Sequence, residues 1–188
     1  VVDVGKGVTD IEQGRRVVIN GVLTCERCHW CMTGMTQQCP STAVVGFGLN
    51  GGLAEYLVWP ASHVISIPDH VTSKEAALVE PLAVANHAIK RACLNIGDRV
   101  AVLCVGTVGI LAMQIAKANG AQVYAIDNRQ MSLELARELG AEATISADES
   151  DIDDIVEDLT DSLGFDVVVD AAGAVGTPTN AIRWVRRG

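Results

Sequence analysis

Four cysteines that lie close together in the sequence are the residues with the clearest chemistry. Cys25, Cys28, Cys31 and Cys39 follow the pattern C-x2-C-x2-C-x7-C. Four thiolates converging over so short a segment match the tetrahedral ligand set of structural Zn²⁺, with Zn–S distances of about 2.3 Å. Four protein ligands leave no coordination position for water or substrate, so the pattern predicts a structural metal and not a catalytic one. Two disulfides are the main alternative, and an iron–sulfur cluster is another.

A second group of residues predicts a turn that binds a dinucleotide. An apolar run ends at Cys104, and Gly106 and Gly109 then match the second and third glycines of a G-x-G-x-x-G fingerprint, with Cys104 in place of the first. Gly106 would let the backbone approach the pyrophosphate, and Gly109 would let a helix pack closely on a sheet. The pyrophosphate would bind at the start of that helix, which includes Thr107 and Val108. A side chain at position 104 is tolerable in this turn if its φ is negative.

The next apolar run ends in the residues expected to meet the adenosine ribose. Asp127 would accept hydrogen bonds from the ribose hydroxyls and repel a 2′-phosphate, so it favours NAD over NADP. Asn128 follows it, and Arg129 keeps NADP open because a nearby arginine can pair with the 2′-phosphate. The alternative for Asp127 is an ordinary carboxylate in a turn at a strand end.

Because the chain otherwise has the features of an intracellular nucleotide enzyme, we favour zinc over disulfides for the cysteines.

Two kinds of scaffold must position these residues. Up to about residue 70, short apolar runs alternate with glycine-rich turns, which predicts a β-rich, barrel-like module with strands at 1–4, 16–19, 51–58 and 64–67. Beyond it, strand and helix patterns alternate, as in an α/β parallel doubly wound sheet of Rossmann type. The predicted strands are 100–104, 122–126, 143–145 and 166–170, and the predicted helices are 73–93, 108–119, 131–139, 152–163 and 179–187. We therefore expect two domains, at 1–70 and 71–188.

Composition limits the class of protein. The 188 residues are 49% hydrophobic and 20% charged, which is typical of a globular protein. A net charge of −9 argues against binding to nucleic acid or to anionic membranes. There is no apolar run long enough to span a bilayer and no secretory signal, which favours a cytoplasmic protein. The sequence begins at Val1 rather than Met, so we interpret it as an internal piece of a longer protein. Cys93 and Cys104 lie among apolar residues and are expected to be inert, buried thiols.

Taken together, the motifs resemble the zinc-dependent medium-chain alcohol dehydrogenases. The resemblance covers essentially the whole sequence and is closest to the polyol branch, which includes sorbitol, butanediol and threonine dehydrogenases. It implies part of a GroES-like catalytic domain followed by a C-terminally truncated Rossmann domain. The segments that carry it are Gly14–Val18, Cys25–Cys39, Gly51–Tyr56, Glu80–Ala88, Val102–Gly109 and Phe165–Gly173.

The resemblance also implies a reaction and further partners. A catalytic zinc polarises the hydroxyl of a small polyol or alcohol, which passes hydride to NAD. Glu80 would ligate this second zinc or hydrogen-bond its water, the alternative being a helix carboxylate near a domain interface. His87, on the same helix face, is expected to be a packed histidine. The other ligands of that zinc, a cysteine and a histidine–glutamate pair, fall outside this sequence, so we expect the 188 residues alone to be inactive. The family also suggests a dimer or tetramer.

Two other functions remain open at this point. One is a zinc-less quinone or enoyl reductase of the same fold, against which the cysteine cluster and Glu80 argue. The other is a nucleotide-sensing protein without enzymatic activity that uses a zinc knuckle to bind a partner. A cysteine and a Gly-His-Glu motif directly upstream would indicate the enzyme.

Overall fold

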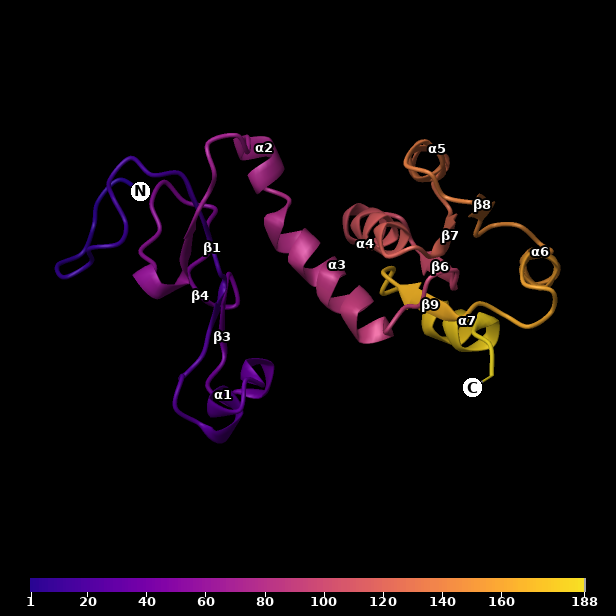
Figure 1. The fold of residues 1–188 in the computed structure, drawn as a ribbon, viewed down its shortest axis with the longest axis horizontal. Coiled ribbons are helices and arrows are strands. Elements are labelled where there is room, and N and C mark those ends of the chain that lie inside the picture. Colours follow the sequence, from indigo (N-terminus) through magenta and orange to yellow (C-terminus); the bar gives the residue numbers. More distant parts are fainter. Residues whose placement is uncertain (188) are drawn as a thin grey trace. The chain divides into compact units, whose positions relative to one another are not determined.

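A computed structural model describes residues 1–187. The chain forms two compact units, one spanning Val1–Val79 and the other beginning at Glu80 (Figure 1). Within the described residues, no helix has the length and apolar character needed to cross a membrane.

The first unit consists of short elements joined by turns. β1 (Val17–Ile19) pairs antiparallel with β5 (Val64–Ser66). A second small sheet has the order β2-β3-β4, in which β2 (Val22–Leu23) is antiparallel to β3 (Ala43–Val45). The remaining elements of this unit are β4 (Gly48–Leu49), α1 (His29–Met32), η1 (Thr36–Gln38), η2 (Ala61–His63) and α2 (Ser73–Ala76).

Two strands predicted in this unit are wrong. Residues 1–4 and 51–58 have apolar sequences but form no strand. A strand needs a partner for its backbone N–H and C=O groups. Neither segment pairs with β1, whose partner is β5. Several apolar side chains of the second segment, among them Leu53, Tyr56 and Val58, are exposed.

The helix predicted over 73–93 is interrupted. The structure has α2 up to Ala76 and then α3 (Val79–Ala92). The proline at position 81 explains the break, because a proline ring clashes with the carbonyl four residues earlier, here that of Ala77. In α3 Pro81 lies in the first turn, where the missing N–H costs no hydrogen bond.

The second unit contains the predicted parallel sheet. Its four strands have the order β8-β7-β6-β9, and every neighbouring pair is parallel. Since β6 is the first of these strands in the sequence and lies between the second and the fourth, the order is that of a doubly wound sheet. The strands are β6 (Arg99–Leu103), β7 (Gln122–Asp127), β8 (Ala143–Ser146) and β9 (Val167–Asp170).

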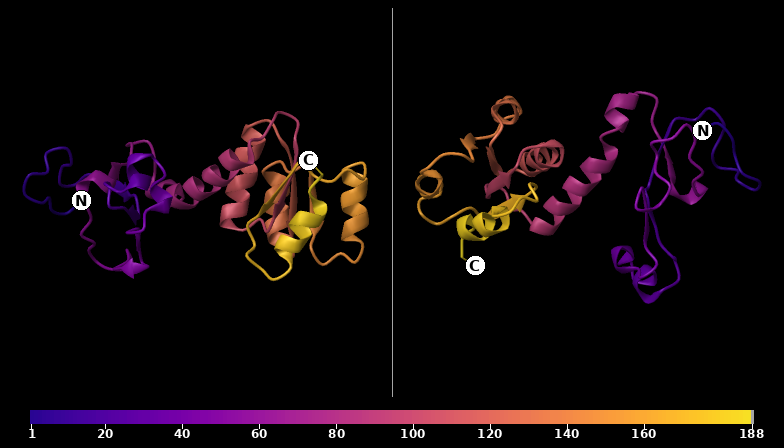
Figure 2. Two further views of the ribbon diagram at one scale, coloured as in Figure 1. Left: turned by 90° about the horizontal axis from the view of Figure 1, so that it is seen from below. Right: turned by 180° about the vertical axis from the view of Figure 1, so that it is seen from behind.

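Alternation along the strands builds a core on each face of this sheet. Val100 and Val102 of β6 pack with α3, α4 (Thr107–Ala118) and α5 (Gln130–Glu138). Ala101 and Leu103 point to the other face and pack with α6 (Ile152–Leu159) and α7 (Thr177–Trp184). Figure 2 shows these helices flanking the sheet. Because both faces are covered, the apolar run of β6 is continuous.

Two helices are shorter than their patterns predict. α6 ends before Thr160, whose hydroxyl donates to the carbonyl of Val156 at 2.7 Å and accepts from the N–H of Gly164 at 3.1 Å. α7 ends at Trp184, and Val185 then forms a parallel bridge with Phe165. Local side-chain and backbone pairing therefore ends each helix before its amphipathic pattern does.

Candidate functional site

The four cysteines of the first unit converge in space. Cys28 precedes α1, Cys31 lies within it, and Cys39 follows η1. The sulfur atoms of these three residues and of Cys25 all lie within 4.8 Å of one another. The Sγ atoms of Cys28 and Cys31 are 3.5 Å apart, close to the roughly 3.8 Å edge of a tetrahedron with Zn–S distances of about 2.3 Å. All four thiols are free. The donor set therefore fits a tetrahedral zinc ion.

Backbone groups and mutual contact give these thiols different acidities. The N–H groups of Arg27 and Cys28 lower the pKa of Cys25 to about 6. The N–H of Cys31 also lowers the pKa of Cys28, but burial and the neighbouring thiols outweigh it and raise that pKa to about 11. The N–H of Cys25 lowers the pKa of Cys39 and donates to its sulfur at 3.4 Å. Backbone groups thus already stabilise negative charge on part of the cluster.

The glycine turn joins β6 to α4 in the second unit. Cys104 adopts a left-handed conformation with φ of 68°, so the expectation of a negative φ at this position is wrong. A Cβ on Gly109 would overlap the carbonyl oxygen of Cys104, so only glycine allows α4 to approach the strand this closely. A Cβ on Gly106 would meet no protein atom closer than 3.4 Å. The protein itself therefore leaves room beside Gly106.

A cavity of about 260 Å³ opens beside this turn. It lies where the strands end: Cys104 follows β6, Asp127 ends β7, Ala147 follows β8 and Ala172 follows β9. Ligands of open α/β sheets bind at this edge, where the strand order reverses. Among residues 1–187, no acceptor pairs with the N–H groups of Thr107, Val108 and Gly109 at the start of α4. The turn, the cavity and these N–H groups fit the phosphates and adenosine of a dinucleotide.

Asp127 is buried beneath this turn. Its Oδ2 atom accepts from the N–H of Val105 at 2.8 Å, and its Oδ1 atom accepts from the N–H of Arg129 at 2.8 Å. Burial raises the pKa of the Asp127 carboxyl, but the side chain and N–H of Arg129 outweigh this and hold the pKa below its usual range. Asp127 is therefore ionised at neutral pH and fastens the glycine turn to the end of β7.

Comparison with known proteins identifies the family to which both parts of the chain are similar. Residues 1–69 match the sequence profile described as "Alcohol dehydrogenase GroES-like domain", and residues 107–188 match the one described as "Zinc-binding dehydrogenase". The chain belongs to the zinc-binding alcohol dehydrogenase family.

Its relatives in this family include sorbitol and L-threonine dehydrogenases. A sorbitol dehydrogenase of Halalkalibacterium halodurans is 34% identical over 190 residues, which cover 100% of this chain and 55% of the relative. An L-threonine 3-dehydrogenase of Bacillus velezensis is 32% identical, covering 100% of this chain and 54% of the relative. A Sinorhizobium meliloti 1021 structure with NADP bound has a TM-score of 0.90 at 31% identity, covering 99% of this chain and 55% of that one. The chain spans about half the length of the curated relatives that it matches.

Within residues 1–187, Glu80 belongs to no group of converging metal ligands. It is exposed in the first turn of α3. His87 is also exposed, so the expectation of a packed histidine is wrong. Among residues 1–187, the four cysteines are the only group of three or more potential metal ligands whose atoms converge.

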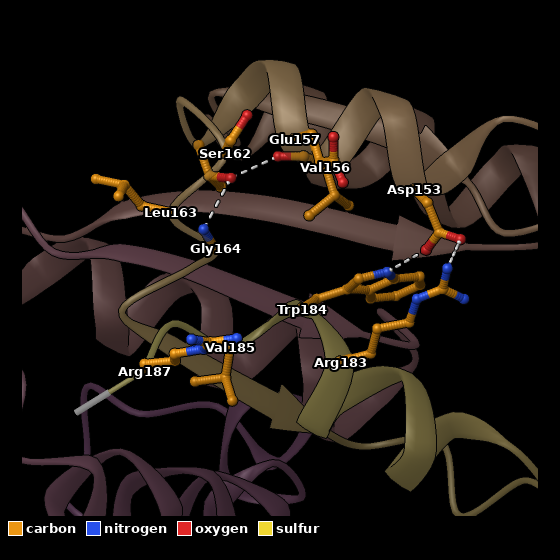
Figure 3. Close-up of a pocket in the computed structure, with 11 residues that line it drawn as sticks. Asp153, Val156, Glu157, Ser162, Leu163, Gly164, Arg183, Trp184, Val185 and Arg187 are labelled. Atoms are coloured by element: carbon orange, nitrogen blue, oxygen red, sulfur yellow. Dashed lines mark hydrogen bonds and ion pairs between the residues drawn. The ribbon is translucent and has the colours of Figure 1, made fainter.

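Sequence reasoning missed several features of the second unit. Cys93 is exposed and Cys104 is partly buried and lines the cavity, so the expectation that both thiols are buried is wrong. Trp184, with an indole N–H that donates to Asp153 at 2.8 Å, lines both this cavity and a second one of about 220 Å³ between α6 and the end of α7 (Figure 3). The only sequence signal for these cavities was a tryptophan at the end of an amphipathic helix. Such a tryptophan indicates core packing rather than a binding site.

Proposed function

We propose that this chain acts in an oxidoreductase that depends on zinc and NAD and transfers hydride between the cofactor and a polyol or secondary alcohol. The observation that carries the proposal is the presence in one chain of a converged four-thiol cluster and a glycine turn fastened to a buried carboxylate. Relatives that are sorbitol and threonine dehydrogenases support the substrate class. The four thiols argue against the zinc-less reductases.

In this proposal, the zinc of the cysteine lobe has a structural role. Cys25, Cys28, Cys31 and Cys39 would hold the ion and leave it no open position for substrate. The ion would fasten the segment between residues 25 and 39. Its removal should therefore change folding rather than chemistry.

The dinucleotide would bind at the glycine turn. The N–H groups of Thr107, Val108 and Gly109 would hold the pyrophosphate, and Gly106 would leave room for it. A separate group would recognise the adenosine ribose: Asp127, Asn128 and Arg129. Asp127 favours NAD, while the relative with bound NADP supports keeping both dinucleotides in the test.

Glu80 is the residue that we assign to the chemistry itself. When bound, a catalytic zinc would supply a Lewis acid that makes the substrate hydroxyl more acidic, and nicotinamide would accept the hydride. The exposed carboxylate of Glu80 is free to bind that metal or to hydrogen-bond its water. The matching Glu-Pro-Leu-Ala sequence supports this role.

Three further properties complete the proposal. We assign the GroES-like domain to residues 1–70 and the Rossmann domain to residues 71–188. The complete protein is a homo-oligomer, dimer or tetramer, as the family suggests. It acts in the cytoplasm, where the reducing environment would keep the cysteines available to a metal.

Metal analysis and an activity screen test the function. We expect the 188-residue chain to carry one zinc and to bind NADH, and the complete gene product to carry two zinc ions and to reduce NAD with sorbitol, butanediol or threonine. A zinc-free chain that reduces quinones would contradict the proposal. The proposal would also be contradicted if the 188-residue chain bound nucleotide and zinc but the complete gene product oxidised no alcohol.

A further inference from the structure

The carboxylate of Asp127 has no free acceptor position. A carboxylate offers about four lone-pair positions, and four donors fill them here. The N–H groups of Val105 and Arg129 occupy one position on each oxygen, both at 2.8 Å. The Arg129 side chain occupies the other two, with Nε 3.3 Å from Oδ1 and Nη2 3.4 Å from Oδ2. The Asp127 side chain is consequently only 1% exposed.

These four donors differ in how easily they can leave. The two backbone N–H groups belong to the turn and to the residue that precedes α5, and they make the shorter bonds. The two side-chain bonds are longer, and the Arg129 side chain is 58% exposed. Displacement of Arg129 would therefore open one acceptor position on each carboxylate oxygen. Two adjacent hydroxyls of a ribose need such a pair of positions.

The guanidinium of Arg129 also lies against the glycine turn. Its Nη2 atom is 3.4 Å from the point that a Cβ on Gly106 would occupy. The side chain therefore spans the carboxylate and the turn beside which the phosphates would bind. A planar, permanently charged fork in this place matches a phosphate as well as a carboxylate.

We propose that Arg129 is a substitute for the ribose and occupies its acceptor positions on Asp127 in the nucleotide-free protein. The ribose diol of NADH displaces the Arg129 side chain from Asp127. When NADPH binds, the displaced side chain pairs with the 2′-phosphate. The proposal rests on the nucleotide site proposed above and goes beyond it, because it makes this chain accept both dinucleotides. NADH must compete with Arg129 for Asp127. NADPH gains an ion pair from the same side chain that it displaces.

Replacing Arg129 should therefore affect the two nucleotides in opposite directions. In Arg129→Ala the competitor for Asp127 is gone, and NADH should bind about fivefold more tightly, the equivalent of one exposed ion pair. NADPH loses its phosphate partner and meets an unscreened Asp127, so it should bind about tenfold more weakly. An arginine that merely supports the fold would shift both affinities in the same direction.

Isothermal titration of the chain with NADH and with NADPH tests this proposal. The matched control is Arg137→Ala, which removes an exposed arginine of α5 whose side chain donates to the Thr144 hydroxyl and not to Asp127. It should leave both affinities unchanged. Arg129→Lys keeps the charge without the fork, so it should keep NADPH binding within about threefold. Circular dichroism of each variant verifies folding.

The outcomes separate this inference from the proposed function. Opposite shifts in Arg129→Ala support it. If the unmodified chain binds NADH but the variant binds NADH no more tightly, or binds NADPH equally well, Arg129 is not a substitute for the ribose and the nucleotide site itself stands. If the unmodified chain binds neither nucleotide, both the site and the inference fail.

Discussion

The cysteine lobe and the glycine turn are both short motifs, but different interactions hold them in shape. In Val1–Val79 the buried side chains are those of Cys39, Ile67 and Ala76. The glycine turn instead adjoins two apolar cores that cover both faces of a four-stranded sheet. Structural zinc contributes about 10–16 kcal/mol in small metal-dependent domains. From this comparison we expect the lobe to need its metal to fold, whereas the protein alone shapes the turn.

The largest effect is expected when one thiol of the cysteine lobe is removed, which should lower its affinity for zinc. Cys39→Ser replaces a ligand that is only 5% exposed, and we expect zinc affinity to fall by more than about 100-fold. Zinc per chain after dialysis measures it. Cys93→Ser, which changes an exposed thiol at the end of α3, is the control and should retain full zinc. If both variants retained the same amount of zinc, the cysteine lobe would not be the metal site.

Two glycine substitutions should separate folding from binding in the turn. Gly109→Ala forces a Cβ into the carbonyl of Cys104, and we expect it to destabilise the second unit by about 3 kcal/mol. In Gly106→Ala the new Cβ meets no protein atom closer than 3.4 Å, so the change should leave stability nearly unchanged while it weakens NADH binding. Denaturant unfolding and titration with NADH measure the two effects. Equal loss of stability in both variants would contradict the account of the turn.

The buried carboxylate should make the turn sensitive to acid. Because the folded-state pKa of Asp127 is lowered, its contribution to stability is present above its unfolded pKa of about 3.9 and is lost as pH falls through the lower folded value. At pH 7, Asp127→Asn should be less stable than the unmodified chain by about 2 kcal/mol. That difference should shrink below pH 4. Unfolding free energies measured from pH 7 to pH 2.5 check this, and a constant difference would argue against an ionised Asp127.

The smallest effect is expected at Glu80, which belongs to neither region. Glu80→Gln changes an exposed side chain in the first turn of α3, so stability should stay within about 0.5 kcal/mol. Zinc bound by the isolated chain should also be unchanged, because the cysteines hold it. A loss of this zinc would place Glu80 in the structural site. In the complete gene product, by contrast, the same change should lower alcohol oxidation.

The alternating half of the sequence predicted its structure better than the first half did. Strands such as 100–104 are continuous apolar runs, because a sheet covered on both faces buries the last four residues of β6, Val100–Leu103. Residues 51–58 carry a similar signal but have no strand partner, and sequence pattern alone does not supply one. Pro81 did contain the information that splits the helix at 73–93.

Two geometric features of the candidate site were predictable from the sequence, but several of its contacts were not. Cysteine spacing predicted the cluster that the structure brings together. The glycine spacing predicted the close approach at Gly109. The left-handed Cys104 and the closure of Asp127 by Arg129 depend on how the end of β7 packs against the turn, which the motif does not encode.

Hydrogen exchange with and without a zinc chelator tests the central contrast most directly. Backbone hydrogen bonds in the lobe include those donated by Met32, Met35 and Cys39. We predict that the chelator abolishes protection of these amides and leaves the amides of β6 and β7 protected. Unchanged protection in the lobe would contradict its dependence on metal, and loss of protection throughout the chain would contradict the independence of the nucleotide-binding unit.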